Sequence, residues 1–299
     1  LTFHEERVAF ASFSPERPEL VFGMDEGGNE RVQFFRLAAD GSEEVPLTAT
    51  PDAKHRWGGW SHDGERFAFA SNRRDEAVFD VYVQGRTETG ADATLVYEGD
   101  GWFDVAGWSP DDDRLALVEA HSGFDQDVYV LDIDTGEVDH VTPHEGRVRY
   151  QSVEWAPDGE ALYCVTDADA DTLHLDRLAF DGSLSTVASG GEWNVDGVAI
   201  DQETGRVVYS RNVEGYTELT VGDLDGTEIA ERPAPTLPDG IAGGVSFAAG
   251  ADRFAVTATA SADNANVYVV DEIGCPEGVP AFFTLPEGDG PFPVIVDIH

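Results

Sequence analysis

The sequence predicts an all-β fold, a β-propeller with about six four-stranded blades, and three observations support this. One sequence pattern recurs along most of the 299 residues at a nearly constant spacing. Each copy contains short apolar or alternating segments separated by turn sequences, which is typical of β-strands. No segment sustains the 3.6-residue periodicity of an amphipathic helix, so helical repeat folds are excluded.

The recurring pattern is an aromatic or aliphatic residue followed by a turn and an apolar segment. The clearest copies are GWSHDGERFAFAS from Gly59, GWSPDDDRLALVE from Gly107 and EWAPDGEALYCVT from Glu154, and weaker copies begin at Ser12, Ala199 and Ser246. The marker residues are Phe13, Trp60, Trp108, Trp155, Ile200 and Phe247, which are 47, 48, 47, 45 and 47 residues apart. Propeller blades have a period of about this length, so six markers predict six blades.

Each repeat also has the turns and strands that a four-stranded blade requires. The marker ends one strand, and Ser-Pro-Asp-Gly or a related sequence forms a turn in which Gly accepts a positive φ. A second apolar strand follows, then a polar loop and an alternating strand such as Asp80–Val83, Asp127–Leu131 or Asn266–Val270. An Asp-Gly or Thr-Gly turn leads to a fourth, more polar strand. Four strands per repeat around a common axis define a propeller.

The charge balance restricts the function. There are 59 acidic and 18 basic residues, for a net charge of −41, and Lys54 is the sole lysine. Such a charge is self-repelling at low salt but largely screened in molar salt, which favours a cytoplasmic protein of a salt-accumulating halophile. An acidic calcium-binding secreted protein and a nucleic-acid mimic remain alternatives. The sequence has no basic stripe of the kind that binds nucleic acid. It also has no apolar segment of 18 residues, the length that a membrane-spanning helix needs.

Motifs for catalysis or for cofactors are missing from the sequence. Asp167-Ala-Asp-Ala-Asp171 resembles the start of an EF-hand loop, but Thr172 and Leu178 occupy the positions that require Gly and Glu. Ser246 lacks the second Gly of a G-x-S-x-G elbow. The eight histidines show no metal-ligand spacing, and Cys164 and Cys275 form no zinc or disulfide pattern. We therefore expect no cofactor and no metal.

Three arginines in the loops between second and third strands are candidate functional residues. Arg73 and Arg74 lie in one such loop and Arg211 in another, within a chain that has few cations. An arginine can bind a substrate carboxylate through two hydrogen bonds, or it can pair with a neighbouring carboxylate of its own chain. Both interpretations stay open, and the structural one is favoured. Trp57 and Trp102 could likewise line an opening or pack in the core.

After residue 271 the repeats give way to two apolar strands, in GVPAFFTLPEGDGPFPVIVDIH. This segment resembles the beginning of the α/β-hydrolase domain in the prolyl oligopeptidase (S9) family of serine peptidases, in its acylaminoacyl-peptidase-like branch. The W-S-P-D-G turns, S-N-R-R-D and Asp-Val-Tyr-Val segments resemble the propeller of that family. The resemblance implies residues 1–271 as the propeller and 272–299 as a linker with the first, truncated part of the hydrolase domain.

The resemblance also implies a function for the chain. In that family the propeller restricts the access of short peptides to a serine triad, and Arg73, Arg74 and Arg211 would take part in this gating. His299 matches a histidine beside the oxyanion loop. The elbow serine and the other triad residues of the family lie beyond this position, so the chain alone is expected to be inactive. The family usually has seven blades, one more than the markers predict.

Two other functions fit the same repeats. W-S-P-D-G turns also occur in TolB-like propellers, so a freestanding TolB- or WD40-like scaffold with a protein partner is the main alternative. A propeller enzyme with metal ligands in its central channel, such as a lactonase, is a third.

Overall fold

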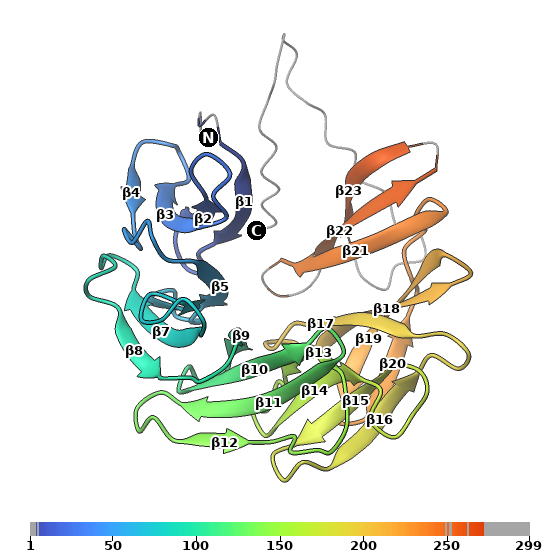
Figure 1. Ribbon diagram of the computed structural model, residues 1–299. Coiled ribbons are helices and arrows are strands. Elements are labelled where there is room, and N and C mark those ends of the chain that lie inside the picture. The colour runs from blue at the N-terminus through green and yellow to red at the C-terminus, as the bar shows by residue number, and fades with distance from the viewer. Residues whose placement is uncertain (1–3, 5, 249, 251–252, 262, 272–299) are drawn as a thin grey trace, which may run out of the picture. The chain divides into compact units, whose positions relative to one another are not determined.

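Six antiparallel sheets make up the computed structural model, which describes residues 4, 6–248, 250, 253–261 and 263–271. Five sheets have four strands and the sixth has three within the described residues, and each is a meander in chain order (Figure 1). The described residues contain no α-helix, and none of their segments is a helix long and apolar enough to span a membrane. The predicted six-bladed β-propeller is confirmed.

The chain divides into two compact units between Pro143 and His144. The first unit contains the sheets β1 (Val8–Phe13), β2 (Glu19–Met24), β3 (Gln33–Ala38), β4 (Glu44–Pro46); β5 (His55–Trp60), β6 (Arg66–Ser71), β7 (Asp80–Gly85), β8 (Thr94–Tyr97); and β9 (Phe103–Trp108), β10 (Arg114–Ser122), β11 (Asp125–Asp132), β12 (Val138–His140).

The second unit contains the sheets β13 (Tyr150–Trp155), β14 (Ala161–Thr166), β15 (His174–Ala179), β16 (Leu184–Ser189); β17 (Val195–Ile200), β18 (Arg206–Val213), β19 (Tyr216–Asp225), β20 (Glu228–Arg232); and β21 (Gly240–Phe247), β22 (Arg253–Ala260), β23 (Asp263–Asp271). The predicted hydrolase segment, residues 272–299, lies outside the described residues.

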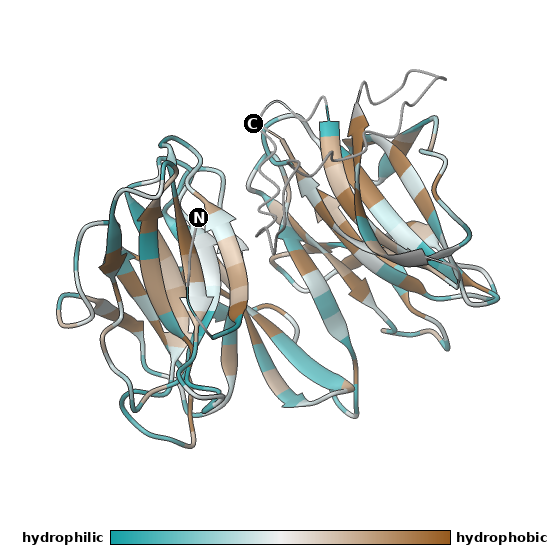
Figure 2. Cartoon of the chain, turned by 90° about the horizontal axis from the view of Figure 1, so that it is seen from above, coloured by the Kyte–Doolittle hydropathy of each residue, from teal (hydrophilic) through white to brown (hydrophobic). Residues whose placement is uncertain are grey.

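The second strand of each blade forms the centre of the core. Every residue of β14 is buried, as are all but one in β2 and β6, because these strands are covered on both faces. The fourth strands are short and largely exposed, as in β4 and β12. Hydrophobic bands accordingly run along the strands while the loops are mostly hydrophilic (Figure 2). The apolar second strands and more polar fourth strands of the sequence predicted this difference in burial.

The predicted turns have the expected backbone geometry. Gly64 and Gly159 have φ values of 64° and 69°, in the left-handed region that glycine tolerates best. The third repeat has Asp112 at this position with φ of 58°, which an aspartate accepts at modest cost. In each case the residue donates its backbone N–H to the carbonyl three positions earlier, at 2.9 Å.

The marker tryptophans connect consecutive blades in the first unit. Trp60 Nε1 donates to the Ser12 carbonyl at 3.3 Å, and Trp108 Nε1 donates to the Gly59 carbonyl at 3.0 Å. The Asp112 carboxylate also accepts the backbone N–H of His62, at 2.9 Å. Trp60 and Trp108 therefore each pack in their own blade and bond to the blade before it.

Candidate ligand pocket in the second blade

A pocket of about 400 Å³ lies beside the second blade, within the size range of small-molecule sites. Two loops line it: residues 49–53, which join β4 to β5, and residues 72–76, which follow β6. The second loop contains the predicted residues Arg73 and Arg74, so both predicted residues lie at one cavity.

Arg73 is held by neutral groups. Its Nη1 donates to the Gly90 carbonyl at 2.9 Å, and its Nη2 lies 3.2 Å from His55 Nε2. The guanidinium carbon lies 4.6 Å from the centroid of the Tyr82 ring and 5.1 Å from that of Phe69, within cation–π range. Among the described residues no carboxylate oxygen lies within 4.0 Å of it. Burial lowers the pKa of Arg73, yet the group stays charged.

His55 fixes the position of Arg73 as a neutral imidazole. The ring is 4 % exposed, and its Nδ1 lies 2.9 Å from the Val32 carbonyl. Because a carbonyl can only accept, the proton belongs on Nδ1. His55 Nε2 then accepts from Thr50 Oγ1 at 2.9 Å and from Arg73. Burial, followed by the charge of Arg73, lowers the pKa of His55 to about 4 against the opposing Val32 hydrogen bond.

Arg74 has a different role although it is adjacent in sequence. Its Nε and Nη2 each donate to one oxygen of Asp80, both at 2.8 Å, and Nη2 also donates to the Gly99 carbonyl. The Asp80 side chain is fully buried, and this pairing raises the pKa of Arg74. A buried carboxylate needs such a partner, so Arg74 holds the loop in place.

Arg211 and His299 do not belong to this pocket. Arg211 lies on β18 in the second unit and donates from Nη2 to Glu218 Oε2 at 3.0 Å. His299 lies outside the described residues. Of the four residues singled out in the sequence, two meet at one cavity, and Arg73 alone of these two contacts no carboxylate among the described residues.

The two tryptophans left open in the sequence differ in their surroundings. Trp57 packs among aromatic rings, with centroids 5.4 Å from Phe67 and 5.5 Å from Phe10. Trp102 is 48 % exposed, and the Arg56 guanidinium lies 5.1 Å from the centroid of its ring. Core packing therefore accounts for Trp57, while Trp102 presents part of its ring to solvent.

Sequence reasoning missed the residues that support Arg73. His55 and Thr50 carry no motif, because their roles depend on contacts between different strands and loops. Gly90 does carry a physical signal: a Cβ at this position would lie 1.7 Å from the Thr48 carbonyl oxygen, so only glycine fits. That close approach brings the Gly90 carbonyl to Arg73. It becomes visible only once the loops are placed.

Comparisons with known proteins identify the fold. No sequence-family profile matches the chain, and no curated protein matches it in sequence. Among solved structures, a prolyl endopeptidase is similar with a TM-score of 0.71 and 14 % identity, over 89 % of this chain and 40 % of that one. Prolyl oligopeptidase B from Galerina marginata is similar with a TM-score of 0.69 and 11 % identity, over 89 % of this chain and 39 % of that one. The chain thus spans about two fifths of the length of these peptidases.

A bacterial TolB structure is similar over more of its own length. The putative TolB from Agrobacterium tumefaciens has a TM-score of 0.56 and 18 % identity, over 76 % of this chain and 81 % of that one. These identities are low enough that the similarity concerns the fold. The chain has the β-propeller fold that is found in both prolyl oligopeptidases and TolB proteins.

Proposed function

We propose that the chain is the substrate-selecting propeller of a prolyl oligopeptidase-type serine peptidase, and that Arg73 binds the carboxylate of short peptides on their way to a hydrolase domain. The observation that carries this proposal is the guanidinium of Arg73, which lines a cavity and contacts no carboxylate among the described residues. In a chain with a net charge of −41, carboxylate partners are abundant. A guanidinium held by neutral groups is a ready site for a ligand carboxylate.

The charges around the pocket suit a zwitterion. Asp52, Asp75 and Glu76 are exposed residues that line the same cavity as Arg73. A free peptide carries an ammonium at one end and a carboxylate at the other. The three acidic side chains provide partners for the ammonium, and Arg73 provides one for the carboxylate. The proposed ligand is therefore a short peptide with free termini.

Two further observations support the peptidase context. The propellers of two prolyl oligopeptidases match 89 % of this chain in fold. Residues 280–299 resemble in sequence the first strands of the hydrolase domain of that family. The proposal includes the gating role of the propeller, its preference among peptides and the assignment to the acylaminoacyl-peptidase-like branch.

Calorimetric titration with short peptides in molar salt tests the proposal. A tripeptide with free termini is expected to bind more tightly than its C-terminally amidated form. R73Q should weaken binding of the free peptide by about tenfold or more, because a charged hydrogen bond contributes about 1.5–3 kcal/mol. R211Q, which removes an arginine in the other unit, is the matched control and should bind normally. Equal affinity for the free and amidated peptides, or for R73Q and the wild type, would overturn the assignment of Arg73.

A freestanding TolB-like interaction scaffold is the second candidate function. It is supported by the fold similarity to a TolB structure, which covers 76 % of this chain and 81 % of the TolB chain. This function predicts no affinity for short peptides with free termini. The same titration therefore separates the two candidates.

A further inference from the structure

The hairpin of β10 and β11 places two carboxylates directly opposite each other, away from the pocket of the second blade. Glu119 on β10 pairs in register with Asp127 on β11. Directly opposed residues on antiparallel strands share one face, with their Cβ atoms about 4.5–5.5 Å apart. Each of the two residues is only 9 % exposed. Like charges at such a position are destabilising unless a cation lies between them.

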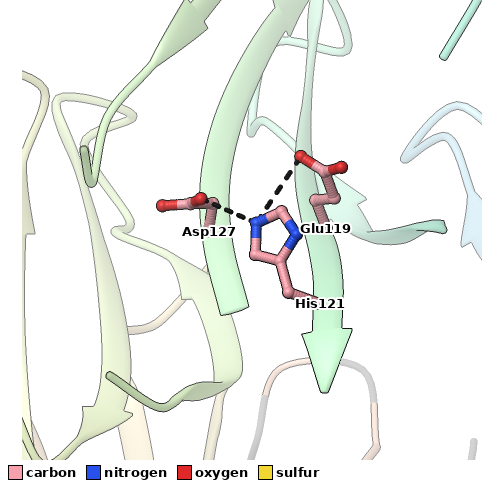
Figure 3. Close-up of side chains that lie close together, drawn as sticks. All are labelled: Glu119, His121 and Asp127. Carbon is pink, nitrogen blue, oxygen red and sulfur yellow. Dashed lines mark hydrogen bonds and ion pairs between the residues drawn. The ribbon is translucent and has the colours of Figure 1, made fainter. Parts of the chain in front are cut away.

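A histidine occupies the space between these carboxylates. The register of the hairpin shifts between Ala120 and Ser122, so His121 lies in a β-bulge, a device that redirects a side chain. Its Nε2 lies 2.9 Å from Asp127 Oδ2 and 3.9 Å from Glu119 Oε2 (Figure 3). The three ligand-type atoms all lie within 4.8 Å of one another.

The neighbouring strand supplies groups that orient the carboxylates. His140 Nε2 lies 2.9 Å from Asp127 Oδ1, the oxygen that does not face His121. Tyr129 donates its hydroxyl to Glu119 Oε2 at 2.9 Å, and its ring stacks on His140 with centroids 4.4 Å apart. Such outer contacts are typical of metal-binding carboxylates.

The space around Glu119 also depends on a glycine. A Cβ added to Gly101 would lie 2.1 Å from Glu119 Oε1. The carboxylate therefore occupies the space that the absent side chain leaves, which restricts where its other oxygen can point. Glu119 is fixed from two sides, by Gly101 and by the Tyr129 hydroxyl.

We propose that Glu119, His121 and Asp127 bind a divalent transition-metal ion such as Zn²⁺. At metal–ligand distances of about 2.0–2.2 Å, tetrahedral ligand atoms are separated by roughly 3.4 Å. The distances of 2.9 and 3.9 Å from His121 Nε2 to the two carboxylate oxygens bracket that value. Small movements of these side chains would bring the three atoms to that spacing, and solvent would supply the fourth ligand.

The donor set selects the class of metal. An imidazole nitrogen with two carboxylates suits zinc and its neighbours, whereas calcium and magnesium prefer oxygen donors alone. Binding uses the lone pair of neutral His121 Nε2. Where that nitrogen carries a proton, the proton is released to solvent as the metal–nitrogen bond forms. The ion replaces the proton as the positive charge between the two carboxylates.

Sequence spacing does not show this site, since residues 119, 121 and 127 match no known ligand motif. The absence of such a motif led to the expectation of no metal. Antiparallel pairing brings Glu119 and Asp127 together across the hairpin, and the bulge directs His121 between them.

Cobalt substitution tests the site. The full chain, freed of metal and kept in molar salt to suppress diffuse cation binding, is titrated with Co²⁺ while visible absorption is recorded. One equivalent of Co²⁺ should give the d–d bands of a four- or five-coordinate ion, and one equivalent of Zn²⁺ should remove them. Millimolar Mg²⁺ should leave them unchanged.

Matched variants locate the ion. D127N and H121Q should each weaken Co²⁺ binding by roughly 100-fold or more, because each removes a ligand. H62Q is the control: His62 also pairs with an aspartate, with Nδ1 2.7 Å from Asp112 Oδ1. H62Q should bind Co²⁺ as the wild type does. X-ray absorption of the zinc-loaded wild type should show one imidazole ligand and needs no variant to fold. An absence of d–d bands, equal affinity in H121Q, or a zinc spectrum without imidazole would overturn the proposal.

Discussion

Acidification should destabilise the protein through His55, and the structure sets the size of the effect. His55 is neutral in the folded chain because both ring nitrogens are already used: Nδ1–H donates to Val32, and Nε2 accepts from Thr50 and Arg73. A second proton on Nε2 would break the two accepted hydrogen bonds and place a positive charge against the Arg73 guanidinium. The ring is also buried, which disfavours the charged form further.

The direction and magnitude follow from the pKa of His55, which changes from 6.5 to about 4 on folding. Between these values the unfolded chain binds the proton and the folded chain does not, so stability falls as the pH is lowered. The full stability is present above pH 6.5. The loss attributable to His55 grows to roughly 3 kcal/mol near pH 4, since each pH unit corresponds to about 1.4 kcal/mol.

The measurement is urea unfolding followed by tryptophan fluorescence, at constant molar salt and at several pH values from 7.5 to 4. The wild type is compared with H55N, which cannot titrate in this range. Many carboxylates also titrate here, but their contribution is common to both proteins and cancels in the difference. H55N should have a lower free energy of unfolding than the wild type at pH 7.5. The difference between the two proteins should narrow by roughly 3 kcal/mol as the pH falls toward 4.

A constant difference between the wild type and H55N across the whole pH range would refute the assignment of a neutral, buried His55. If the difference in unfolding free energy between the wild type and H55N widened on acidification, the fold would be stabilising the His55 imidazolium. Either result would also mean that His55 is not the neutral acceptor for the Arg73 guanidinium.

Two further predictions concern stability at neutral pH. R74Q should lower the free energy of unfolding more than R211Q does, because it leaves the buried Asp80 carboxylate without its guanidinium partner, whereas the Glu218 carboxylate that pairs with Arg211 is 53 % exposed. Similar losses for the two variants in urea unfolding would contradict this distinction. W108F should cost about 1–3 kcal/mol, because it removes the indole donor and leaves the Gly59 carbonyl without this bond; an unchanged urea midpoint would show that the bond contributes nothing.

The sequence was sufficient to predict the fold because the fold is repetitive. A covered strand needs an apolar run, and this signal recurs at a nearly constant spacing from Phe13 to Phe247. A residue with positive φ also follows every marker except Phe13 within three to five positions. Asp112 shows the limit of the rule, since it takes the glycine position without being glycine. The number of blades was predictable because the marker positions recur every 45 to 48 residues, and at two of them the indole of Trp60 or Trp108 also bonds to the preceding blade.

The site was less predictable because its residues meet across strands. The sequence singled out Arg73 and Arg74 for their rarity but could not separate them. Their difference depends on Asp80, six residues from Arg74, and on His55, which a different strand supplies. The Glu119–His121–Asp127 cluster was missed for the same reason, since its register and bulge are properties of a formed hairpin.

The indole bonds of Trp60 and Trp108 also restrict how such a chain can change in length. The second repeat carries both a donor for the blade before it, the Trp60 indole, and an acceptor for the blade after it, the Gly59 carbonyl. Deletion of this whole repeat would therefore place the Trp108 indole opposite the equivalent acceptor in the first repeat, the Ser12 carbonyl. Removal of only part of the repeat would leave a donor or an acceptor without its partner. In evolution, blade number in this architecture should accordingly change in steps of about 48 residues, while shorter insertions are confined to the loops between strands.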